Sequence, residues 1–244
     1  MASVEKLAFY LLKKVNKAMR NYEVIDDGDR TAVAVSGGKD SLSLLKLLAH
    51  RRSSVGEDHE LVSLHVQSDM QCNADISRAE LERLFREQRV EYSSERVAIN
   101  DHQWEPGRQP GWFWCSWNPR KAPFTAAHRL RCNKLALGHH ADDVAQTTLL
   151  NLVYHGRLET MEPKVSFFDG EITLTRPLVY VPEKELVRFA KACGFPVEGS
   201  PCPSGLASKR DKMRDLLRAL EKESPRVKAN VLRAVRSYGL PDST

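Results

Sequence analysis

Two periodicities alternate along this chain. Short apolar runs are typical of buried strands, and stretches with an apolar residue every three or four positions are typical of amphipathic helices. The predicted strands cover residues 31–35, 60–66, 90–99, 134–138 and 171–178. The predicted helices cover residues 3–20, 75–89, 119–131, 144–154 and 182–194, and one more begins at Ser41. Strands and helices that alternate in this way indicate a parallel sheet with crossover helices.

This order predicts an α/β fold with an open, parallel, five-stranded sheet and helices on both faces. Residues 1–25 then form a helical N-terminal extension, residues 26–198 the α/β domain, and residues 199–244 a basic helical C-terminal region. Neither period continues through residues 100–118, which contain two prolines, two glycines and all four tryptophans. We interpret this stretch as a loop at the carboxyl edge of the sheet.

The composition is that of an ordinary globular protein, with 244 residues of which 41% are hydrophobic and 28% charged. No apolar run approaches the roughly 20 residues that span a bilayer, and the N-terminus lacks the separate regions of a signal peptide. The five cysteines are scattered and odd in number, unlike a secreted disulfide framework. We interpret Cys132 and Cys193 as packing residues in predicted helices. These features predict a soluble cytoplasmic protein with reduced thiols and no membrane contact.

The stretch AVAVSGGKDS places two glycines between a predicted strand and a predicted helix. Such a turn directs backbone N–H groups and a helix N-terminus toward one point, where an anion is stabilised. Gly37 and Gly38 let the backbone approach a phosphate, Ser36 and Ser41 offer hydroxyls, and Lys39 adds a positive charge. The spacing matches neither the Walker A loop nor the Rossmann fingerprint. The stretch therefore predicts a nucleotide-phosphate site of another kind, and a merely tight turn is the alternative.

These residues resemble the PP-loop of the N-type ATP pyrophosphatases, a superfamily that includes tRNA thiolases, tRNA lysidine synthetase and ammonia-using synthetases. Residues 135–164 and 175–190 are similar to the corresponding stretches of the tRNA 2-thiocytidine synthetase branch. The sequences around Cys115 and Cys202 are similar to that branch as well. The resemblance extends over about residues 22–235.

The resemblance implies an ATP-dependent enzyme that adenylates a pyrimidine base in tRNA, releases pyrophosphate and transfers sulfur to the base. The cofactors it implies are ATP and Mg²⁺, with Asp40 serving the metal ion. The residues it assigns to ATP are Ser36, Gly37, Gly38, Lys39, Asp40, Ser41, His65, Val66, Gln67, Gly138, His139 and Asp142. The catalytic residues it assigns are Asp40, Cys115, Asp143 and Cys202. Its partners are tRNA and a sulfur donor protein or sulfide, and it is compatible with a homodimer.

The motif GHHADD has three interpretations. Two histidines and two carboxylates invite a zinc site, but side chains of the adjacent His139 and His140 would point in opposite directions on an extended backbone. An aspartate could cap the helix expected to begin near Val144. The resemblance instead implies that Asp142 or Asp143 orients the adenylated intermediate or acts as an acid–base group. Arg176, at a predicted strand end, could contact phosphate or fix the following turn.

The cysteines depart from the pattern of the thiocytidine branch. That branch carries C-x-x-C before the central helix and one further cysteine late in the chain, and these ligate a [4Fe–4S] cluster. Cys115 and Cys202 match two of these positions, but Asn118 occupies the third, and Cys72 is a candidate replacement. Iron–sulfur clusters are held by thiolates, so an amide is a poor substitute. Three interpretations remain open: a cluster at Cys115 and Cys202, a thiol relay between them, or packing of Cys115 among tryptophans.

The charge distribution adds one further alternative. The net charge is +5, and residues 207–236 contain ten Lys or Arg against four acidic residues. This basic region is either a solvated helical face or a contact for phosphate groups of RNA. The tryptophans, three of which precede Arg120 and Lys121 closely, could stack on an unpaired base or cover the ATP edge. Two other functions also remain: an adenylating ligase without sulfur chemistry, and a non-catalytic ATP-binding paralogue.

Overall fold

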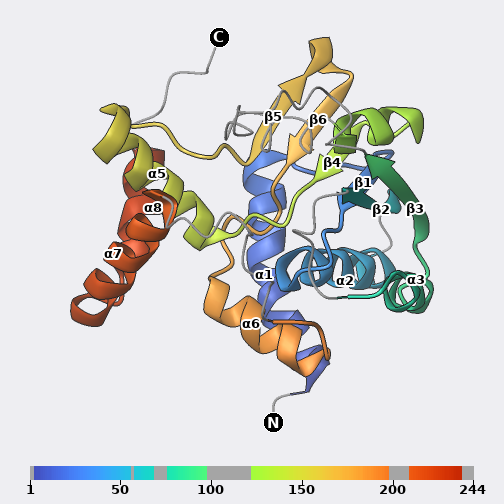
Figure 1. Cartoon of the computed structure of the whole chain (residues 1–244), viewed down its shortest axis with the longest axis horizontal. Coiled ribbons are helices and arrows are strands. Elements are labelled where there is room, and N and C mark those ends of the chain that lie inside the picture. Colours follow the sequence, from blue (N-terminus) through green and yellow to red (C-terminus); the bar gives the residue numbers. More distant parts are fainter. Residues whose placement is uncertain (1–2, 56–57, 69–75, 98–121, 198–208, 238–244) are drawn as a thin grey trace, which may run out of the picture.

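The computed structural model describes residues 3–55, 58–68, 76–97, 122–197 and 209–237. One sheet of six strands lies at its centre, in the order β3-β2-β1-β4-β6-β5 (Figure 1). The strands are β1 (Arg30–Ala34), β2 (Glu60–Ser68), β3 (Glu91–Val97), β4 (Lys134–Ala136), β5 (Lys164–Phe167) and β6 (Ile172–Thr175). The helices are α1 (Val4–Tyr22), α2 (Lys39–Val55), α3 (Arg78–Glu87), α5 (Ala141–His155), α6 (Glu183–Ala192), α7 (Lys209–Glu223), α8 (Val227–Ser237) and a further helix over 122–129.

The five predicted strands are confirmed as β1, β2, β3, β4 and β6. Every pairing among these five strands is parallel. The structure adds a sixth strand, β5, which runs antiparallel to β6 at one edge of the sheet. Its four residues are half-buried or exposed, so they lack the apolar run by which the other strands were predicted. The turn into β6 uses the left-handed region at Asp169 (φ 52°) and Gly170 (φ 94°), as tight hairpin turns require.

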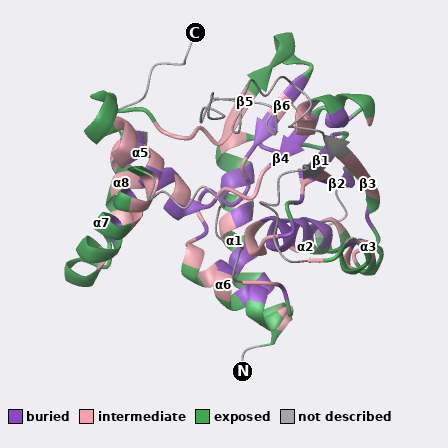
Figure 2. Ribbon diagram, in the orientation of Figure 1, coloured by how far each residue is buried: buried purple, intermediate pink, exposed green. Residues whose placement is uncertain are grey.

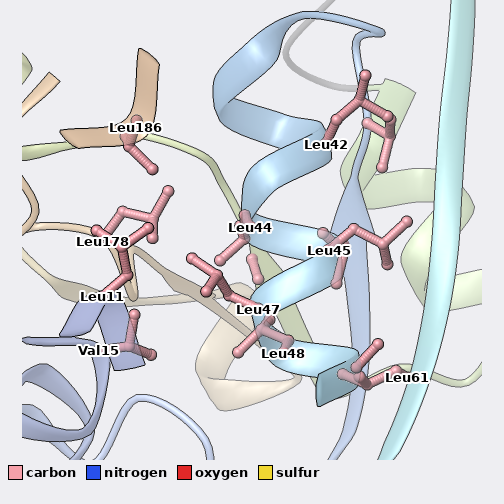
Figure 3. Close-up of a cluster of buried hydrophobic side chains, with 14 of the residues drawn as sticks. Leu11, Val15, Leu42, Leu44, Leu45, Leu47, Leu48, Leu61, Leu178 and Leu186 are labelled. Carbon is pink, nitrogen blue, oxygen red and sulfur yellow. The ribbon is translucent and has the colours of Figure 1, made fainter. Parts of the chain in front are cut away.

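Helices cover both faces of the sheet, as predicted. On one face, α2 packs between α1 and the sheet, and its leucines lie between Leu11 and Val15 of α1 and Leu61 of β2 (Figure 3). On the other face, the helix over 122–129 covers a second buried cluster that includes Ala32 and Leu135. Strands β1, β2, β4 and β6 are largely buried, whereas the described residues of β3 and β5 are half-buried or exposed. The outer surfaces of α3 and α7 are largely exposed (Figure 2).

Helices α5, α7 and α8 form a group beside the sheet, and both C-terminal helices pack on α5 (Figure 1). The C-terminal region is therefore helical, as predicted, while the division of the chain into three regions stays a prediction. Among the described residues, no helix is both long and apolar enough to cross a membrane.

Two helices begin earlier than the sequence predicts. Helix α2 begins at Lys39 instead of Ser41, and α5 begins at Ala141 instead of near Val144. The apolar periodicity starts only where each helix reaches the core, whereas the first turn of each helix consists largely of polar residues. Lys39 and Asp40 consequently lie in the first turn of α2, and Asp142 and Asp143 lie in the first turn of α5.

Replacing Phe189 in α6 tests this core. Its side chain is fully buried, and we expect Phe189→Ala to lower the free energy of unfolding by about 3–5 kcal/mol. The matched control is Phe9→Ala in α1, where the residue is 56% exposed and the expected change stays within about 0.5 kcal/mol. Urea denaturation followed by circular dichroism measures both. Equal losses in the two variants would contradict the assignment of Phe189 to the core.

Candidate nucleotide site

The turn between β1 and α2 forms a cradle of backbone and hydroxyl groups. Gly37 adopts a φ of 89°, a left-handed conformation that favours glycine. The Ser41 hydroxyl donates to the carbonyl of Gly38 (3.0 Å) and accepts from the backbone N–H of Ser36 (3.2 Å), which ties the two ends of the turn together. Since α2 begins at Lys39, its first N–H groups lie at this turn. The prediction of a tight turn that opens a helix is confirmed, and its geometry suits an anion.

Gly138 brings a second loop against this cradle. A Cβ atom at Gly138 would lie 3.0 Å from the carbonyl carbon of Asp40 and 3.0 Å from the backbone nitrogen of Ser41. These neighbours are backbone atoms, which cannot move aside as the end of a side chain can. The loop after β4 can therefore approach the start of α2 this closely only because residue 138 is glycine.

A third helix begins at the same place. The Lys39 ammonium lies 3.2 Å from the Glu183 carboxylate in the first turn of α6. The backbone N–H of Glu183 donates to the Asp142 carboxylate (2.7 Å), and the N–H of Ala141 donates to the carbonyl of Val181 (3.0 Å). The N-termini of α2, α5 and α6 thus converge. Each contributes the positive end of a helix dipole, which favours a bound anion.

The two carboxylate oxygens of Asp40 differ in their hydrogen bonding. Its Oδ2 lies 3.0 Å from the Lys39 ammonium, whereas Oδ1 is buried and has no hydrogen-bond partner among the described residues. Burial raises the pKa of Asp40, against the lowering effects of His140 and Lys39. Burial would lower the pKa of Lys39, but Asp40 and Glu183 outweigh it and raise that pKa. A carboxylate oxygen left without a partner is suited to a hard cation.

Asp142 and Asp143 connect the site to the C-terminal helices. Besides accepting from Glu183, Asp142 pairs with Lys228 of α8 at 2.5 Å and is 4% exposed. Burial would raise the pKa of Asp142, but the hydrogen bonds from Glu183 and Lys228 outweigh burial and lower it. Asp143 accepts from Arg210 of α7 (2.8 Å) and from the backbone N–H of His140 (3.0 Å).

The residue before α5 is His140, so no aspartate precedes this helix, but Asp143 takes part in its cap as a member of a capping box. Asp143 lies in the first turn of α5 and accepts the His140 N–H from there. The reason is the earlier start of α5, which moves both aspartates inside the helix. Acidic side chains in a first turn are stabilised by the helix dipole.

The two histidines face different neighbours. His140 lies 3.9 Å from Asp40 and 3.4 Å from Asp143, while Nδ1 of His139 accepts a hydrogen bond from Arg176 (3.3 Å). Burial, reinforced by Arg176, lowers the pKa of His139 to about 4, and burial lowers the pKa of Arg176 to about 10. Arg176 also donates to the carbonyl of Glu162. Arg176 thus fixes the loop that follows β6 to the residues before α5.

His65, Val66 and Gln67 lie inside β2, near its end. Strand β1 ends at Ala34 while β2 continues to Ser68, so no described strand pairs with this last part of β2 on the β1 side. His65 Nδ1 lies 2.8 Å from the carbonyl of Val35, which holds the imidazole next to the cradle. The structure thus brings the predicted strand end to the phosphate turn.

The cysteines predicted to act in catalysis lie outside the described residues. This holds for Cys115 and Cys202, for Asn118 and Cys72, and for the tryptophans. Of the described cysteines, Cys132 is buried, which raises the pKa of its thiol to about 11, and burial also raises the pKa of the half-buried Cys193. The interpretation of these two as packing residues is confirmed. Within the described ranges, no group of three or more His, Cys, Asp or Glu side chains could hold a metal ion.

Sequence reasoning missed Glu183, Arg210 and Lys228 as members of the site. They come from helices that follow the cradle by more than 140 residues, and no local motif contains them. The only signal was charge: Glu183 opens a predicted helix, and the other two belong to the basic C-terminal region.

Comparisons with known proteins agree with this geometry. Residues 10–219 match the family model of the PP-loop domain. The tRNA-cytidine(32) 2-sulfurtransferase of Citrifermentans bemidjiense is 40% identical over 242 residues, which cover 96% of this chain and 93% of the relative. The protein of the same name from Geobacter sulfurreducens is also 40% identical, over 96% of this chain and 92% of its own length.

Two solved structures share the fold. The U34-tRNA thiolase NcsA from Methanococcus maripaludis, solved with its [4Fe–4S] cluster, has a TM-score of 0.75 at 22% identity and covers 99% of this chain and 82% of its own. The NAD+ synthetase from Burkholderia pseudomallei has a TM-score of 0.51 at 13% identity. The match covers 99% of this chain and 92% of the synthetase. Both likenesses support the α/β architecture.

Gly138→Ala tests the close approach of the loop after β4 to the start of α2. The added Cβ would press on the backbone of Asp40 and Ser41, so we expect ATP affinity to fall at least about tenfold, the equivalent of about 1.4 kcal/mol. Gly156→Ala is the matched control: it adds the same atom at a φ of 63°, where nothing lies within 4 Å, and strains only the end of α5. Isothermal titration calorimetry measures both. Unchanged ATP affinity in Gly138→Ala would contradict the proposed contact.

His139 predicts a pH dependence of stability. Unfolded histidine titrates near pH 6.5, whereas His139 titrates at about 4 in the folded chain. Between these values the unfolded chain binds a proton that the folded chain does not, so this contribution to stability is complete above pH 6.5 and is lost progressively as the pH falls to 4. We expect the free energy of unfolding of the wild type to fall by up to about 3 kcal/mol through this group between pH 6.5 and 4. We expect His139→Gln to lack this part of the pH dependence.

The control for this profile is His128→Gln, because the His128 side chain is 68% exposed. Urea denaturation between pH 4 and 8 gives the free energy of unfolding as a function of pH. We expect this dependence to have the wild-type slope in His128→Gln and a flatter slope in His139→Gln. Identical slopes for wild type and His139→Gln would show that His139 is not held neutral.

Proposed function

The chain belongs to the PP-loop family, and from that premise we propose that it is an ATP-dependent tRNA sulfurtransferase. It adenylates a cytidine base in tRNA, releases pyrophosphate and replaces the activated oxygen by sulfur. The observation that carries this proposal is the match, over nearly the full length of both chains, to relatives named tRNA-cytidine(32) 2-sulfurtransferase. Those names favour position 2 of cytidine 32 as the acceptor. We place this activity in the cytoplasm, where tRNA is modified.

The cradle binds the triphosphate of ATP in this proposal. Backbone N–H groups at Gly37 and Gly38, the hydroxyls of Ser36 and Ser41, and the Lys39 ammonium face one region, to which three helix N-termini add positive potential. These donors are fixed before ATP arrives, so they stabilise charge that develops on the leaving pyrophosphate. The end of β2 at His65, Val66 and Gln67 offers backbone groups to the adenine.

Mg²⁺ fits beside Asp40. The buried Oδ1 of this residue has no hydrogen-bond partner in the described ranges, and carboxylate oxygens are the ligands that Mg²⁺ prefers. The ion is commonly held by one or two carboxylates together with phosphates of the substrate, so a single protein ligand is sufficient. When bound, it supplies positive charge to the phosphates.

Asp143 is our candidate for the acid–base or orienting role. Asp142 accepts from Glu183 and pairs with Lys228, so its carboxylate holds α5, α6 and α8 together. Asp143 accepts from Arg210, whose side chain is 43% exposed. His139 and Gly138 complete the loop: the first is fixed by Arg176, and the second provides the space for the close approach.

Cys115 and Cys202 are proposed to handle the sulfur. Their residue types do not complete the three-thiolate set that a [4Fe–4S] cluster takes in the thiocytidine branch, because Asn118 supplies an amide. We therefore derive no step through a cluster. A thiol relay needs thiolates, and Arg120 and Lys121 lie close enough in sequence to Cys115 to favour them.

The test uses anaerobically purified protein, ATP and unmodified tRNA, with pyrophosphate release and 2-thiocytidine measured separately. We expect both products from wild type, and we expect Cys115→Ser and Cys202→Ser to lose thiolation by at least about a hundredfold while ATP binding persists. Cys193→Ser is the matched control, since burial raises the pKa of that thiol. Thiolation by both serine variants would favour an adenylating ligase, and absence of tRNA-dependent pyrophosphate release would favour a non-catalytic paralogue.

The same preparation tests the cluster. Iron and sulfide assays and the visible absorbance spectrum distinguish a cluster from free thiols. An active, colourless and iron-free protein would eliminate the cluster, and stoichiometric iron and sulfide would eliminate the relay of bare thiols.

A further inference from the structure

A groove lies between the N-terminal and C-terminal helices. It has a volume of 630 Å³ and is lined by Lys14 and Lys17 of α1, by Ala229, Leu232 and Arg233 of α8, and by Tyr180. Tyr180 forms one wall, where its ring is 5.8 Å from that of Tyr22 and its hydroxyl donates to the Tyr22 hydroxyl (2.9 Å). The groove is thus a concave surface with cations on both sides and a fixed aromatic ring.

The two helices that line it carry a strong excess of positive over negative charge. Helix α1 contains five basic residues and one acidic residue, and α8 contains three basic residues and no acidic one. Together they have a net charge of +7, more than the +5 of the whole chain. Such a pair of facing basic helices is an electrostatic site for a polyanion.

Two of the three cations that line the groove form no ion pair within the described part of the chain. Lys17 forms no ion pair there and lies 5.1 Å from the centre of the Tyr180 ring, and Arg233 donates only to Asn230. Lys14 is different, because it pairs with Glu185 at 2.5 Å. Lys17 and Arg233 therefore remain available to phosphate groups.

The arginines of α7 have other partners. Arg214 and Arg218 pair with aspartates of the same helix, and Arg210 pairs with Asp143. The basic C-terminal region thus resolves into a helix whose arginines are partly neutralised and a helix, α8, that presents Arg233 to the groove. Charge count alone could not separate them.

The groove is joined to the nucleotide site at two points. In α8, Lys228 pairs with Asp142, and Arg233 follows five residues later, about 7.5 Å along the helix axis. In the opposite wall, Tyr180 precedes Val181, whose carbonyl accepts from the first residue of α5. A polynucleotide held in the groove would consequently lie near the first turn of α5, which contains Asp142 and Asp143.

We propose that the groove between α1 and α8 binds the sugar–phosphate backbone of the RNA substrate, with Lys17 and Arg233 as phosphate contacts. This inference rests on the proposed function, because it takes tRNA as the substrate. Phosphate contacts position an RNA without reading its sequence, so the groove orients the tRNA while other groups receive the reacting base. Tyr180 provides a surface on which a ribose or an unpaired base can lie.

The test is equilibrium binding of an unmodified tRNA transcript to the full chain between 50 and 300 mM KCl. We expect Lys17→Gln combined with Arg233→Gln to weaken binding at least about fivefold at 100 mM KCl and to reduce the slope of log Kd against log salt by about 1.5, as two lost phosphate contacts require. The affinity for ATP should stay at the wild-type value, since neither residue touches the cradle.

The matched control is Arg83→Gln combined with Arg86→Gln on α3, which removes the same charge from side chains that are 66% and 80% exposed. If the groove variant and this control bind tRNA equally well, or lose affinity equally, the groove inference is overturned. That result leaves the proposed function intact as long as wild type thiolates tRNA. A wild-type protein that neither binds nor thiolates tRNA overturns the proposed function, and the groove inference with it.

Discussion

The site depends on the close approach of Gly138 to the backbone of Asp40 and Ser41. A Cβ at residue 138 would lie 3.0 Å from this backbone, so Asp40 and Ser41 would have to shift by a few tenths of an ångström to accommodate it. This approach brings the loop after β4 to the turn after β1, so that two strand-to-helix units share one anion site. Helix α6 joins them through Glu183, which contacts both Lys39 and Asp142. The positive ends of three helices are thereby held together.

Charge balance explains why these polar groups tolerate burial. A buried carboxylate needs hydrogen bonds or a cation, and Asp142 has both, from Glu183 and Lys228. Asp40 is the exception, since one of its oxygens is left without a partner in the described ranges. The C-terminal helices therefore contribute cations to the first turn of α5, which contains Asp142 and Asp143. Because α8 also lines the basic groove, the surface proposed for RNA and the nucleotide site share one structural element.

The fold of this chain does not by itself determine which molecule is activated. The fold is shared with a tRNA thiolase and with an NAD+ synthetase, which act on different acceptors, so the architecture alone does not decide what is activated. In the proposed function, the cradle binds the ATP that activates the acceptor. The proposed sulfur chemistry uses Cys115 and Cys202, and Asn118 stands where the three-cysteine pattern has its remaining cysteine.

Features that depend on neighbouring residues could be predicted from the amino-acid sequence. Apolar periodicity predicted the five parallel strands and their helices, and the stretch from Ser36 to Ser41 predicted the anion turn, because both are recorded within a few consecutive positions. Strand β5 escaped prediction because its half-exposed residues carry no apolar run. The pairing of Asp142 with Lys228 and of Asp143 with Arg210 could be learned only from the folded chain, and so could the identity of the cations that face the groove. Such contacts join residues far apart in sequence and are set by how the helices pack.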